Sequence, residues 1–279
     1  MQVEIRNLRI AFDNHGRRFE AVRGISLSMG REKLGIVGES GSGKSLTARA
    51  LMKLLPRQAQ ISADRMTLDG IDILKASERD MRGIRGKRVG FILQDPKYSL
   101  NPVKTIGKQI GEAWSQHKKG SRAEARAATL DLLEQVKIRD PEKVFDSYPH
   151  EISGGMGQRA MIAMMLAPDP ELLIADEPTS ALDASVQAEI LRLIDDLVES
   201  RGMGLILISH DLPLVSHFCD RVSVMYMGQV MEEMAASELR RARHPYTQGL
   251  LNCMPSLIHP RGRLPVLVRD EAWMQEATR

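Results

Sequence analysis

Gly38-Glu39-Ser40-Gly41-Ser42-Gly43-Lys44-Ser45 is the stretch that decides the fold. It follows the apolar run at residues 34–37 and precedes residues 46–55, which we expect to form a helix stopped by Pro56. A strand, a glycine-rich loop and a helix in this order give the pattern GxxxxGKS the context that a phosphate-binding loop requires. The sequence therefore predicts a phosphate site at this junction.

The residue types of this loop suit that chemistry. Glycines at positions 38, 41 and 43 open backbone conformations that other residues avoid, so that successive N–H groups can converge on phosphate oxygens. The helix that follows adds the partial positive charge of its N-terminus. We expect Lys44 to reach the β- and γ-phosphates and the Ser45 hydroxyl to bind Mg²⁺. The alternative, a glycine-rich turn with a stray lysine, does not explain why strand, loop and helix agree.

Length and composition place only wide limits on the number of domains and on the class of partner. The 279 residues suffice for one large domain or two small ones, and 43% of them are hydrophobic, enough for a sizeable core. The net charge of +3 argues neither for nor against nucleic acid. Basic residues do cluster at positions 79–88, where we expect a solvated connector before the next strand.

Cysteine use and hydropathy narrow the class of protein. Cys219 and Cys253 have no CxxC neighbour, so neither a zinc site nor a disulfide framework is indicated. The N-terminus alternates like a strand, so we expect a strand there and not a signal peptide. The densest apolar stretch, residues 160–167, is far shorter than the roughly 20 residues of a membrane span. We therefore expect membrane contact only through a partner.

Two strands are predicted ahead of the loop, at residues 3–11 and 19–29. Antiparallel strands in this position suggest a small β-layer beside the nucleotide. An aromatic side chain of that layer could stack on adenine, with Phe12 as the first candidate and Phe19 as the second. An ordinary core role is as good an explanation for either residue.

A predominantly helical insertion is predicted at about residues 97–164. The strand at residues 88–93 ends before Gln94, which either is a polar loop residue or touches Mg²⁺ or the attacking water. Ser121 and Glu124 form a capping-box signature for a helix over 121–137, and residues 103–116 could form another. Pro141 and residues 148–150 break the helical pattern.

The second half of the chain carries polar residues at the ends of its predicted elements. Ser153-Gly154-Gly155 opens a helix that runs to residue 166 and offers a second anion-binding N-terminus. The apolar strand 172–175 ends in Asp176 and Glu177, and parallel sheets bind ligands beyond such strand ends. Asp183 precedes a helix with one apolar face, and the strand 204–209 ends before His210. Residues 221–230 are predicted to form strands with a turn at 228–229.

Together these motifs resemble the nucleotide-binding subunit of ATP-binding-cassette (ABC) transporters. The phosphate loop alone gives only the NTPase superfamily, whereas the SGG segment between Gln94 and the carboxylate strand, followed by SALD and SHD, is much more specific. The resemblance covers residues 3–258. It implies an α/β fold: a RecA-like P-loop NTPase core, an antiparallel β-subdomain and an inserted α-helical subdomain. The implied domains are an ABC ATPase domain at 1–245 and a C-terminal extension at 246–279.

The resemblance also implies a role for each motif. Residues 38–45 would bind ATP, and Mg²⁺ would be bound by Ser45 and Gln94, with Asp176 held close through water. Glu177 would act as the general base on water, and His210 would contact the γ-phosphate. The motif Ser153, Gly154 and Gly155 would complete the site of a partner subunit, and Asp183 would lie in the loop that joins the two sites.

More closely, the chain resembles the peptide/nickel importer branch, through GIVGESGSGKS, SGGMGQR, LLIADEPTSALD and the extension HPYTQGLL. That branch implies a second, different ATP-binding subunit, two transmembrane permease subunits and an extracytoplasmic solute-binding protein. The expected place is the cytoplasmic face of the bacterial inner membrane. Gly157 stands where the branch often has arginine. Many relatives carry a cysteine-rich iron–sulfur segment, but only Cys253 lies in that part here, so we expect no cluster.

Three functions are candidates for a cassette with these motifs. The first is an ATPase that energises import of small peptides, with nickel, opine or glycoside import by the same machinery as the alternative. The second is a DNA-repair or chromosome ATPase, which the short span from Gln94 to Ser153 disfavours because it leaves no room for a long coiled coil. The third is a translation-associated cassette, which normally carries two cassettes in one chain. We expect the transport function and no nucleic-acid partner.

Overall fold

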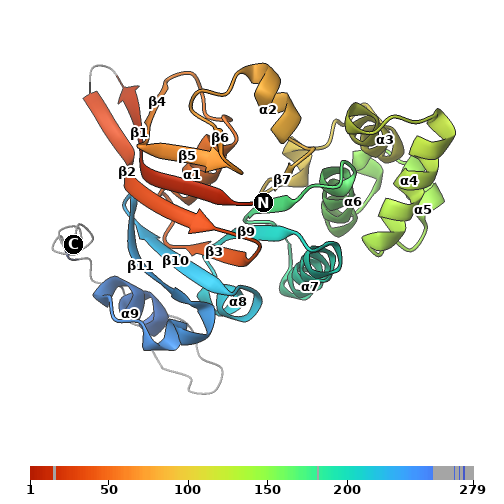
Figure 1. Ribbon diagram of the computed structural model, residues 1–279. Coiled ribbons are helices and arrows are strands. Elements are labelled where there is room, and N and C mark those ends of the chain that lie inside the picture. Colours follow the sequence, from red (N-terminus) through yellow and green to blue (C-terminus); the bar gives the residue numbers. More distant parts are fainter. Residues whose placement is uncertain (15–16, 181, 254–266, 268–269, 271–272, 274–279) are drawn as a thin grey trace. The chain divides into compact units, whose positions relative to one another are not determined.

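The computed structural model describes residues 1–14, 17–180, 182–253, 267, 270 and 273. Its contacts divide the chain into two compact units. The helical unit comprises Met1 and residues 76–206, and the P-loop unit comprises residues 2–75 and 207–279. Figure 1 colours both units along the sequence.

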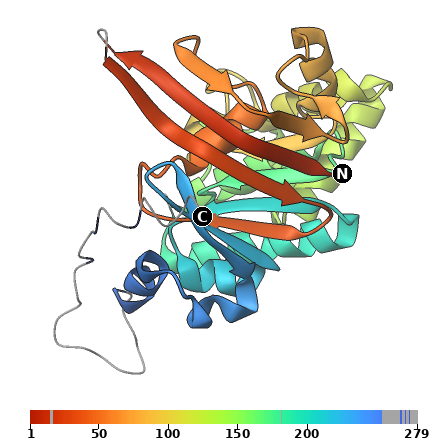
Figure 2. The same cartoon turned by 60° about the vertical axis from the view of Figure 1, so that its left-hand side comes forward.

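The P-loop unit contains an antiparallel sheet built on one long hairpin. Strands β1 (Val3–Asn14) and β2 (Arg17–Met29) pair from Val3 opposite Met29 to Asn14 opposite Arg17 (Figure 2). Strand β1 also pairs with β4 (Ala59–Ser62) and β5 (Arg65–Leu68), and β5 turns into β6 (Ile71–Asp72). The alternation predicted from residue 3 is present in two phases: Val3 and Ile5 are buried, and Leu8 and Ile10 are buried after a register shift between Ile5 and Leu8. The antiparallel layer expected ahead of the loop is therefore present.

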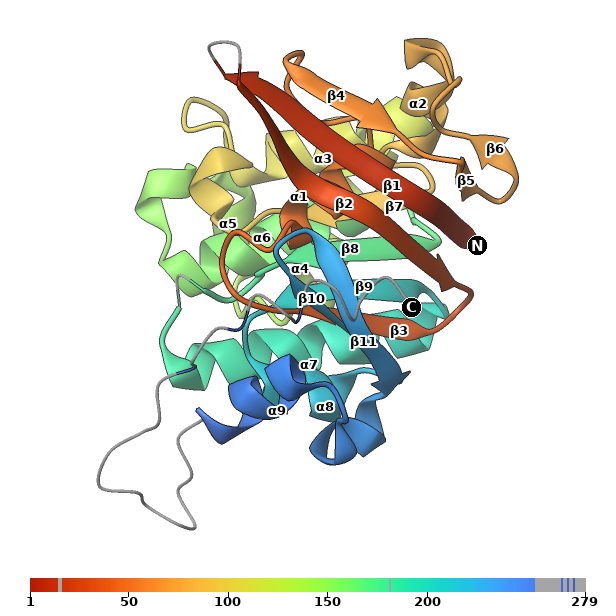
Figure 3. The ribbon, with the colours of Figure 1, turned by 90° about the vertical axis from the view of Figure 1, so that its left-hand side faces the viewer.

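The same unit holds the strand that leads into the phosphate-binding loop. Strand β3 (Lys33–Val37) pairs in parallel with β10 (Arg221–Tyr226), and β10 pairs antiparallel with β11 (Gln229–Ala235) (Figure 3). The remaining elements of the unit are α1 (Lys44–Leu51), α8 (Leu212–Phe218), the 3₁₀ helix η3 (Ala236–Arg241) and α9 (Pro245–Asn252).

The helical unit carries two neighbouring parallel strands. Strands β7 (Val89–Ile92) and β8 (Leu172–Asp176) pair with Val89 opposite Leu172 and Ile92 opposite Ala175. Every residue of both strands is buried, as expected for an apolar strand inside a parallel sheet. Strand β9 (Gly204–Ser209) begins in this unit and ends in the P-loop unit.

Helices form the rest of the helical unit, and four of them, α3 to α6, gather in one group (Figure 1). They are α2 (Glu78–Ile84), α3 (Ile106–His117), α4 (Arg122–Gln135), α5 (Pro141–Asp146), α6 (Gly154–Leu166) and α7 (Ala184–Arg201), with short 3₁₀ turns η1 (Pro96–Tyr98) and η2 (Pro149–Glu151). The predicted capping box of α4 is confirmed, because the Ser121 hydroxyl accepts from the Glu124 N–H and the Glu124 carboxylate accepts from the Ser121 N–H.

Several predicted boundaries were wrong for local reasons. Helix α1 ends at Leu51, four residues before the predicted end, because Lys53 takes a positive φ of 50° and Leu54 N–H returns to the Arg49 carbonyl. Pro141 does not break a helix but starts α5, where the first position needs no N–H donor and Asp140 caps the helix.

The predicted connector at residues 79–88 is also more ordered than expected. It contains α2, whose N-cap Ser77 forms a capping box with Asp80. Arg88 pairs with Glu171 at 2.9 Å, and Arg85 pairs with Glu78 at 2.6 Å. Two of the basic residues are therefore neutralised within the unit, which leaves less free charge for an outside partner.

The turn between β10 and β11 lies one residue earlier than predicted. Met227 and Gly228 form it, both with positive φ (43° and 84°), as a two-residue hairpin loop requires. Within the described residues, no helix has the length and apolar content that crossing a membrane requires.

Candidate nucleotide-binding site

The loop from Gly38 to Gly43 joins β3 to α1, as predicted. Gly38, Gly41 and Gly43 have φ values of 147°, 81° and 99°, in the region that side-chain-bearing residues avoid. At Gly38 a Cβ atom would also overlap the backbone carbonyl of Met225. The strand, the loop and the hairpin beside it thus fix a path that only glycine can follow at this point.

The ammonium group of Lys44 lies inside the loop. Its side chain is buried, and Nζ donates to the carbonyl oxygens of Gly38 and Glu39 at 2.8 Å each. The Ser42 hydroxyl lies 3.5 Å from the same nitrogen. Because backbone carbonyls hold the Lys44 ammonium inside the loop, this positive charge has a fixed position. A fixed positive charge there would attract an anion to the loop.

The first turn of α1 holds the end of the loop in place. The Thr47 hydroxyl and the Thr47 N–H both donate to the Gly43 carbonyl, at 3.0 and 2.9 Å. Ser45 is half-buried in the first turn, next to Lys44. A cation, a helix N-terminus and a glycine-rich run of N–H groups together fit the phosphate groups of a nucleotide.

The loop is held from one side by the β10–β11 turn. Gly228 N–H donates to the Ser42 carbonyl at 3.0 Å, and Arg23 N–H of β2 donates to the Gly228 carbonyl at 2.7 Å. A hollow of about 400 Å³ adjoins the loop, lined by Glu39, Ser40, Gly41, Ser42, Tyr226 and Met227. This bracing fixes the loop by backbone contacts that the sequence pattern alone does not reveal.

In the helical unit, β7 and β8 bring three of the predicted residues, Gln94, Asp176 and Glu177, to the same end of the strand pair. Because Ile92 lies opposite Ala175, the segments that follow the two strands leave the sheet at the same edge. Gln94 follows β7 and is exposed, whereas Asp176 ends β8 and is 3% exposed. A buried carboxylate beside a polar amide is a donor set that suits a magnesium ion.

Glu177 has a strained backbone at the end of β8. Its φ is 47°, in the left-handed region that a glutamate seldom adopts, and its side chain is half-buried. The Ser180 N–H and hydroxyl both donate to the Glu177 carbonyl, at 3.3 and 3.2 Å, and help to hold this conformation. Strain of this kind concentrates at functional positions, which suits a carboxylate aimed for chemistry.

The predicted SGG motif begins α6. Ser153 is the N-cap, and its hydroxyl accepts from the Met156 N–H at 3.3 Å, while Ser153 and Gly154 remain exposed. A hollow of about 330 Å³ places this motif beside the segment that follows Gln94, and its lining includes Asp95, Pro96, Ser153 and Gly154. Gly157 is buried there, and a Cβ on it would meet Pro96 at an ordinary 3.8 Å.

Gln158, one turn further along α6, was missed by the sequence analysis. Its side chain is 1% exposed and donates to the carbonyl of Pro178, the residue after Glu177. The contact ties the helix of the SGG motif to the segment that carries the carboxylate. Its only sequence signal is a glutamine on the buried side of an apolar helix.

Asp183 caps α7. Its carboxylate accepts from the Ser185 hydroxyl at 2.6 Å and from the Val186 N–H at 3.1 Å. The Ser185 hydroxyl, followed by the Val186 N–H, lowers the pKa of Asp183 below its ordinary value. The carboxylate is therefore ionised and held in place at a helix N-terminus.

The remaining predicted residues lie in the P-loop unit. His210 follows β9 and is exposed. Phe12 lies opposite Phe19 in the β1–β2 ladder, with Phe12 half-buried and Phe19 59% exposed. The stacking of Phe12, or else of Phe19, on adenine stays a prediction.

Comparison with known proteins then decides the family. The model of the ABC transporter family matches residues 22–180, more than half of the chain. The chain belongs to the ABC transporter family. The family uses ATP, so the ABC cassette found here is a nucleotide-binding ATPase, and the predicted fold class is confirmed.

Curated relatives cover most of this ABC cassette. The probable peptide ABC transporter ATP-binding protein y4tR of Sinorhizobium fredii is 48% identical over 94% of this chain and 80% of its own length. The oligopeptide transport ATP-binding protein OppD of Bacillus subtilis is 46% identical over 91% of this chain and 72% of its own. The dipeptide transport ATP-binding protein DppD of Escherichia coli is 44% identical over 95% of this chain and 82% of its own.

Solved structures share the fold. The dimeric ATP-binding cassette MJ0796, in a post-hydrolysis state bound to ADP and Pi, superposes with a TM-score of 0.73 at 26% identity. The match covers 84% of this ABC cassette and 98% of that chain. The cassette cbiO1 of Clostridium perfringens, described as part of the transporter complex cbiONQ, gives a TM-score of 0.72 at 25% identity.

Proposed function

We propose that this ABC cassette is the ATP-hydrolysing subunit that energises an importer of small peptides. The observation that carries the proposal is the loop from Gly38 to Ser45, with the Lys44 ammonium buried inside it, in a chain whose similar relatives are named as peptide and dipeptide transport ATP-binding proteins. The loop supplies the charge and the backbone donors for a triphosphate. The names of the relatives indicate that the transported solute is a small peptide.

Each predicted residue has a role in this proposal. Lys44 and backbone N–H groups from within residues 38–45 hold the β- and γ-phosphates. Ser45 and Gln94 would hold Mg²⁺, with Asp176 close to it through water, and the bound ion would neutralise charge on the phosphate oxygens. Phosphoryl transfer depends on such positioning and charge stabilisation more than on covalent chemistry.

Glu177 is the general base of the proposed mechanism. Its carboxylate accepts a proton from the attacking water and orients that water toward the γ-phosphate. His210 contacts the γ-phosphate from the end of β9. The strained backbone of Glu177 supports this role because it fixes the direction in which the carboxylate points.

A second cassette completes the site. Ser153, Gly154 and Gly155 face the nucleotide of a partner ATP-binding subunit, and Asp183 lies in the segment between the two sites. The exposed N-terminus of α6 supports this arrangement, and the similar cassette MJ0796 is described as dimeric. Hydrolysis then depends on the closure of two subunits.

The other partners follow from the importer function. Two transmembrane permease subunits and an extracytoplasmic solute-binding protein would select the cargo, and this chain would sit at the cytoplasmic face of the inner membrane through its partners. No nucleic acid is needed. The domain limits 1–245 and 246–279, with a helical subdomain at about 97–164 and no iron–sulfur cluster, remain part of the proposal.

Uptake by the source cells tests the cargo. Labelled dipeptide and labelled nickel are supplied to cells with the wild-type chain or with Lys44→Ala. Loss of dipeptide uptake alone supports peptide import, whereas loss of nickel uptake alone assigns the cassette to metal acquisition. If neither changes, the cassette serves another solute, such as an opine or a glycoside.

A further inference from the structure

A tyrosine far along the chain contacts the phosphate-binding loop. Tyr246 of α9 is fully buried, and its hydroxyl oxygen accepts a hydrogen bond from the Glu39 N–H at 3.1 Å. Both residues belong to the P-loop unit. We propose that Tyr246 is a positioning residue for ATP binding: it fixes the peptide group that holds the Lys44 ammonium. This inference rests on the proposed role of the loop in holding the nucleotide.

The geometry of one peptide group carries the argument. The peptide between Gly38 and Glu39 is planar and trans, so its carbonyl oxygen and its N–H point in opposite directions. Lys44 Nζ donates to the Gly38 carbonyl at 2.8 Å, and the Glu39 N–H donates to Tyr246 on the opposite side. Tyr246 and Lys44 therefore hold the two ends of the same dipole. If the tyrosine contact were lost, this peptide could rotate, and the Lys44 ammonium would lose a fixed acceptor.

The hydrogen bond to Tyr246 also determines which N–H groups of the loop can contact a phosphate. The Glu39 N–H donates to Tyr246 and the Ser42 N–H donates to the Glu39 carbonyl, so the phosphate contacts fall to other N–H groups of the loop. The hydroxyl thus selects which backbone groups point into the loop. An aliphatic side chain at position 246 would remove the acceptor of this partly buried N–H, which carries a cost in free energy.

Tyr246 is itself held rigidly. Its ring lies 4.5 Å from the ring of Tyr226, at the end of β10, and 5.6 Å from the ring of Trp273. The Tyr246 N–H donates to Nδ1 of His244 at 3.1 Å, and the His244 N–H donates to the Glu232 carboxylate of β11 at 3.1 Å. Ring packing and the contacts at the start of α9 restrict the Tyr246 side chain, so its hydroxyl holds the Glu39 N–H in one position.

Tyr246→Phe tests the proposal because it keeps the ring and removes only the acceptor oxygen. We expect the affinity of the full chain for ATP and ADP, measured by calorimetry, to fall about five-fold, the size expected for one neutral hydrogen bond. The KM for ATP should rise by the same factor with kcat near the wild-type value. The melting temperature without nucleotide should fall by only a few degrees, because the ring packing stays and one partly buried hydrogen bond is lost.

Thr247→Val is the matched control. Thr247 is the next residue of α9, is fully buried, and its hydroxyl has no hydrogen-bond partner among the described residues. The valine therefore removes a buried hydroxyl of the same helix without touching the loop, and ATP affinity should stay at the wild-type value.

The outcomes separate this inference from the proposed function. If the wild-type chain and Thr247→Val bind ATP and Tyr246→Phe binds it equally well, the positioning role is refuted. A lower melting temperature with unchanged ATP affinity would also refute it, since it would mean that the tyrosine only stabilises the fold. If the wild-type chain does not bind ATP at all, the proposed function fails first.

Discussion

Lys44 Nζ donates to the carbonyl oxygen of Gly38 across 2.8 Å, so the cation of the phosphate-binding loop is fixed by the residue that starts the loop. A second bond to the Glu39 carbonyl, also 2.8 Å, holds the ammonium from a neighbouring peptide. The charge is thus in place before any phosphate arrives, and little reorganisation is needed for binding.

Replacement of Lys44 by alanine should remove this charge. We expect the affinity for ATP to fall about ten-fold or more, since hydrogen bonds to charged groups contribute about 1.5–3 kcal/mol each. Titration of the purified chain with ATP measures the loss. Lys75→Ala, at a side chain that is 87% exposed, is the control and should bind as the wild type does. Equal affinity of both variants would contradict the role of Lys44.

Replacement of Glu177 by glutamine should separate binding from hydrolysis. The amide keeps the size of the side chain but cannot accept the proton of water, so we expect hydrolysis to fall about 100-fold or more while ATP binding persists. Phosphate release and ATP titration are measured on the same sample. Glu142→Gln, at an exposed residue of α5, is the matched control. Normal phosphate release by Glu177→Gln would show that another group is the base.

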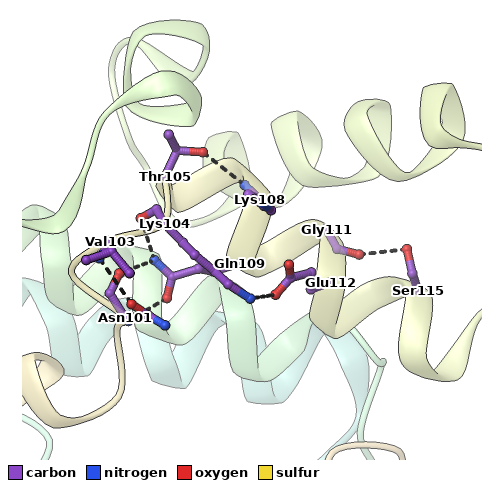
Figure 4. A network of polar contacts seen from close by, with 9 residues as sticks. All are labelled: Asn101, Val103, Lys104, Thr105, Lys108, Gln109, Gly111, Glu112 and Ser115. Atoms are coloured by element: carbon purple, nitrogen blue, oxygen red, sulfur yellow. Dashed lines mark hydrogen bonds and ion pairs between the residues drawn. The ribbon is translucent and has the colours of Figure 1, made fainter.

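Gln109 should stabilise the segment that leads from the Gln94 loop into α3. Its buried amide accepts from the Asn101 N–H at 2.7 Å and donates to the carbonyls of Asn101 and Lys104 at 3.0 and 2.9 Å (Figure 4). Gln109→Leu keeps the volume but leaves these groups without partners, so we expect the free energy of unfolding to fall by about 2–3 kcal/mol.

Chemical denaturation measures that change. Ser115→Ala on the same helix is the control, because the Ser115 hydroxyl only returns to the Gly111 carbonyl at an exposed site (Figure 4). A Gln109→Leu protein as stable as the control would mean that the three bonds contribute nothing net.

The stability of the first turn of α7 should depend on pH, because the Asp183 carboxylate caps this helix. Its pKa is lowered, chiefly by the Ser185 hydroxyl, so its stabilising effect is complete above the ordinary value of 3.8 and is lost as the pH falls through the folded-state pKa. Ser185→Ala should raise the pKa of Asp183 toward that ordinary value. Carboxyl resonances followed by NMR during an acid titration measure it, and an unchanged pKa would exclude the serine as the cause.

The elements around the loop were predictable because their signals are local. GxxxxGKS after an apolar run, the Ser121–Glu124 capping box and the fully apolar strand before Asp176 each lie within a few neighbouring residues, and the structure confirms all three elements. The boundary errors are local too. Helix α1 ends where the backbone takes a positive φ at Lys53. The sequence gives no signal for this, because neither Gly nor Pro stands at that position.

The supports of the site could not be predicted because they join distant residues. Tyr246 reaches Glu39 across 207 positions, and Gln158 reaches Pro178 from another element. The close approach of the Met225 carbonyl, which excludes a Cβ atom at Gly38, depends on how β10 lies beside β3. Such contacts follow from strand order and helix placement, which one sequence does not specify.

Dipeptide uptake by cells whose copy of this chain carries Glu177→Gln tests the central claim most directly. The account predicts uptake at the background level with Glu177→Gln and at the wild-type rate with Glu142→Gln, with both variants present in wild-type amounts by immunoblot. Dipeptide uptake at the wild-type rate in the Glu177→Gln cells would contradict the claim that hydrolysis at this site drives peptide import.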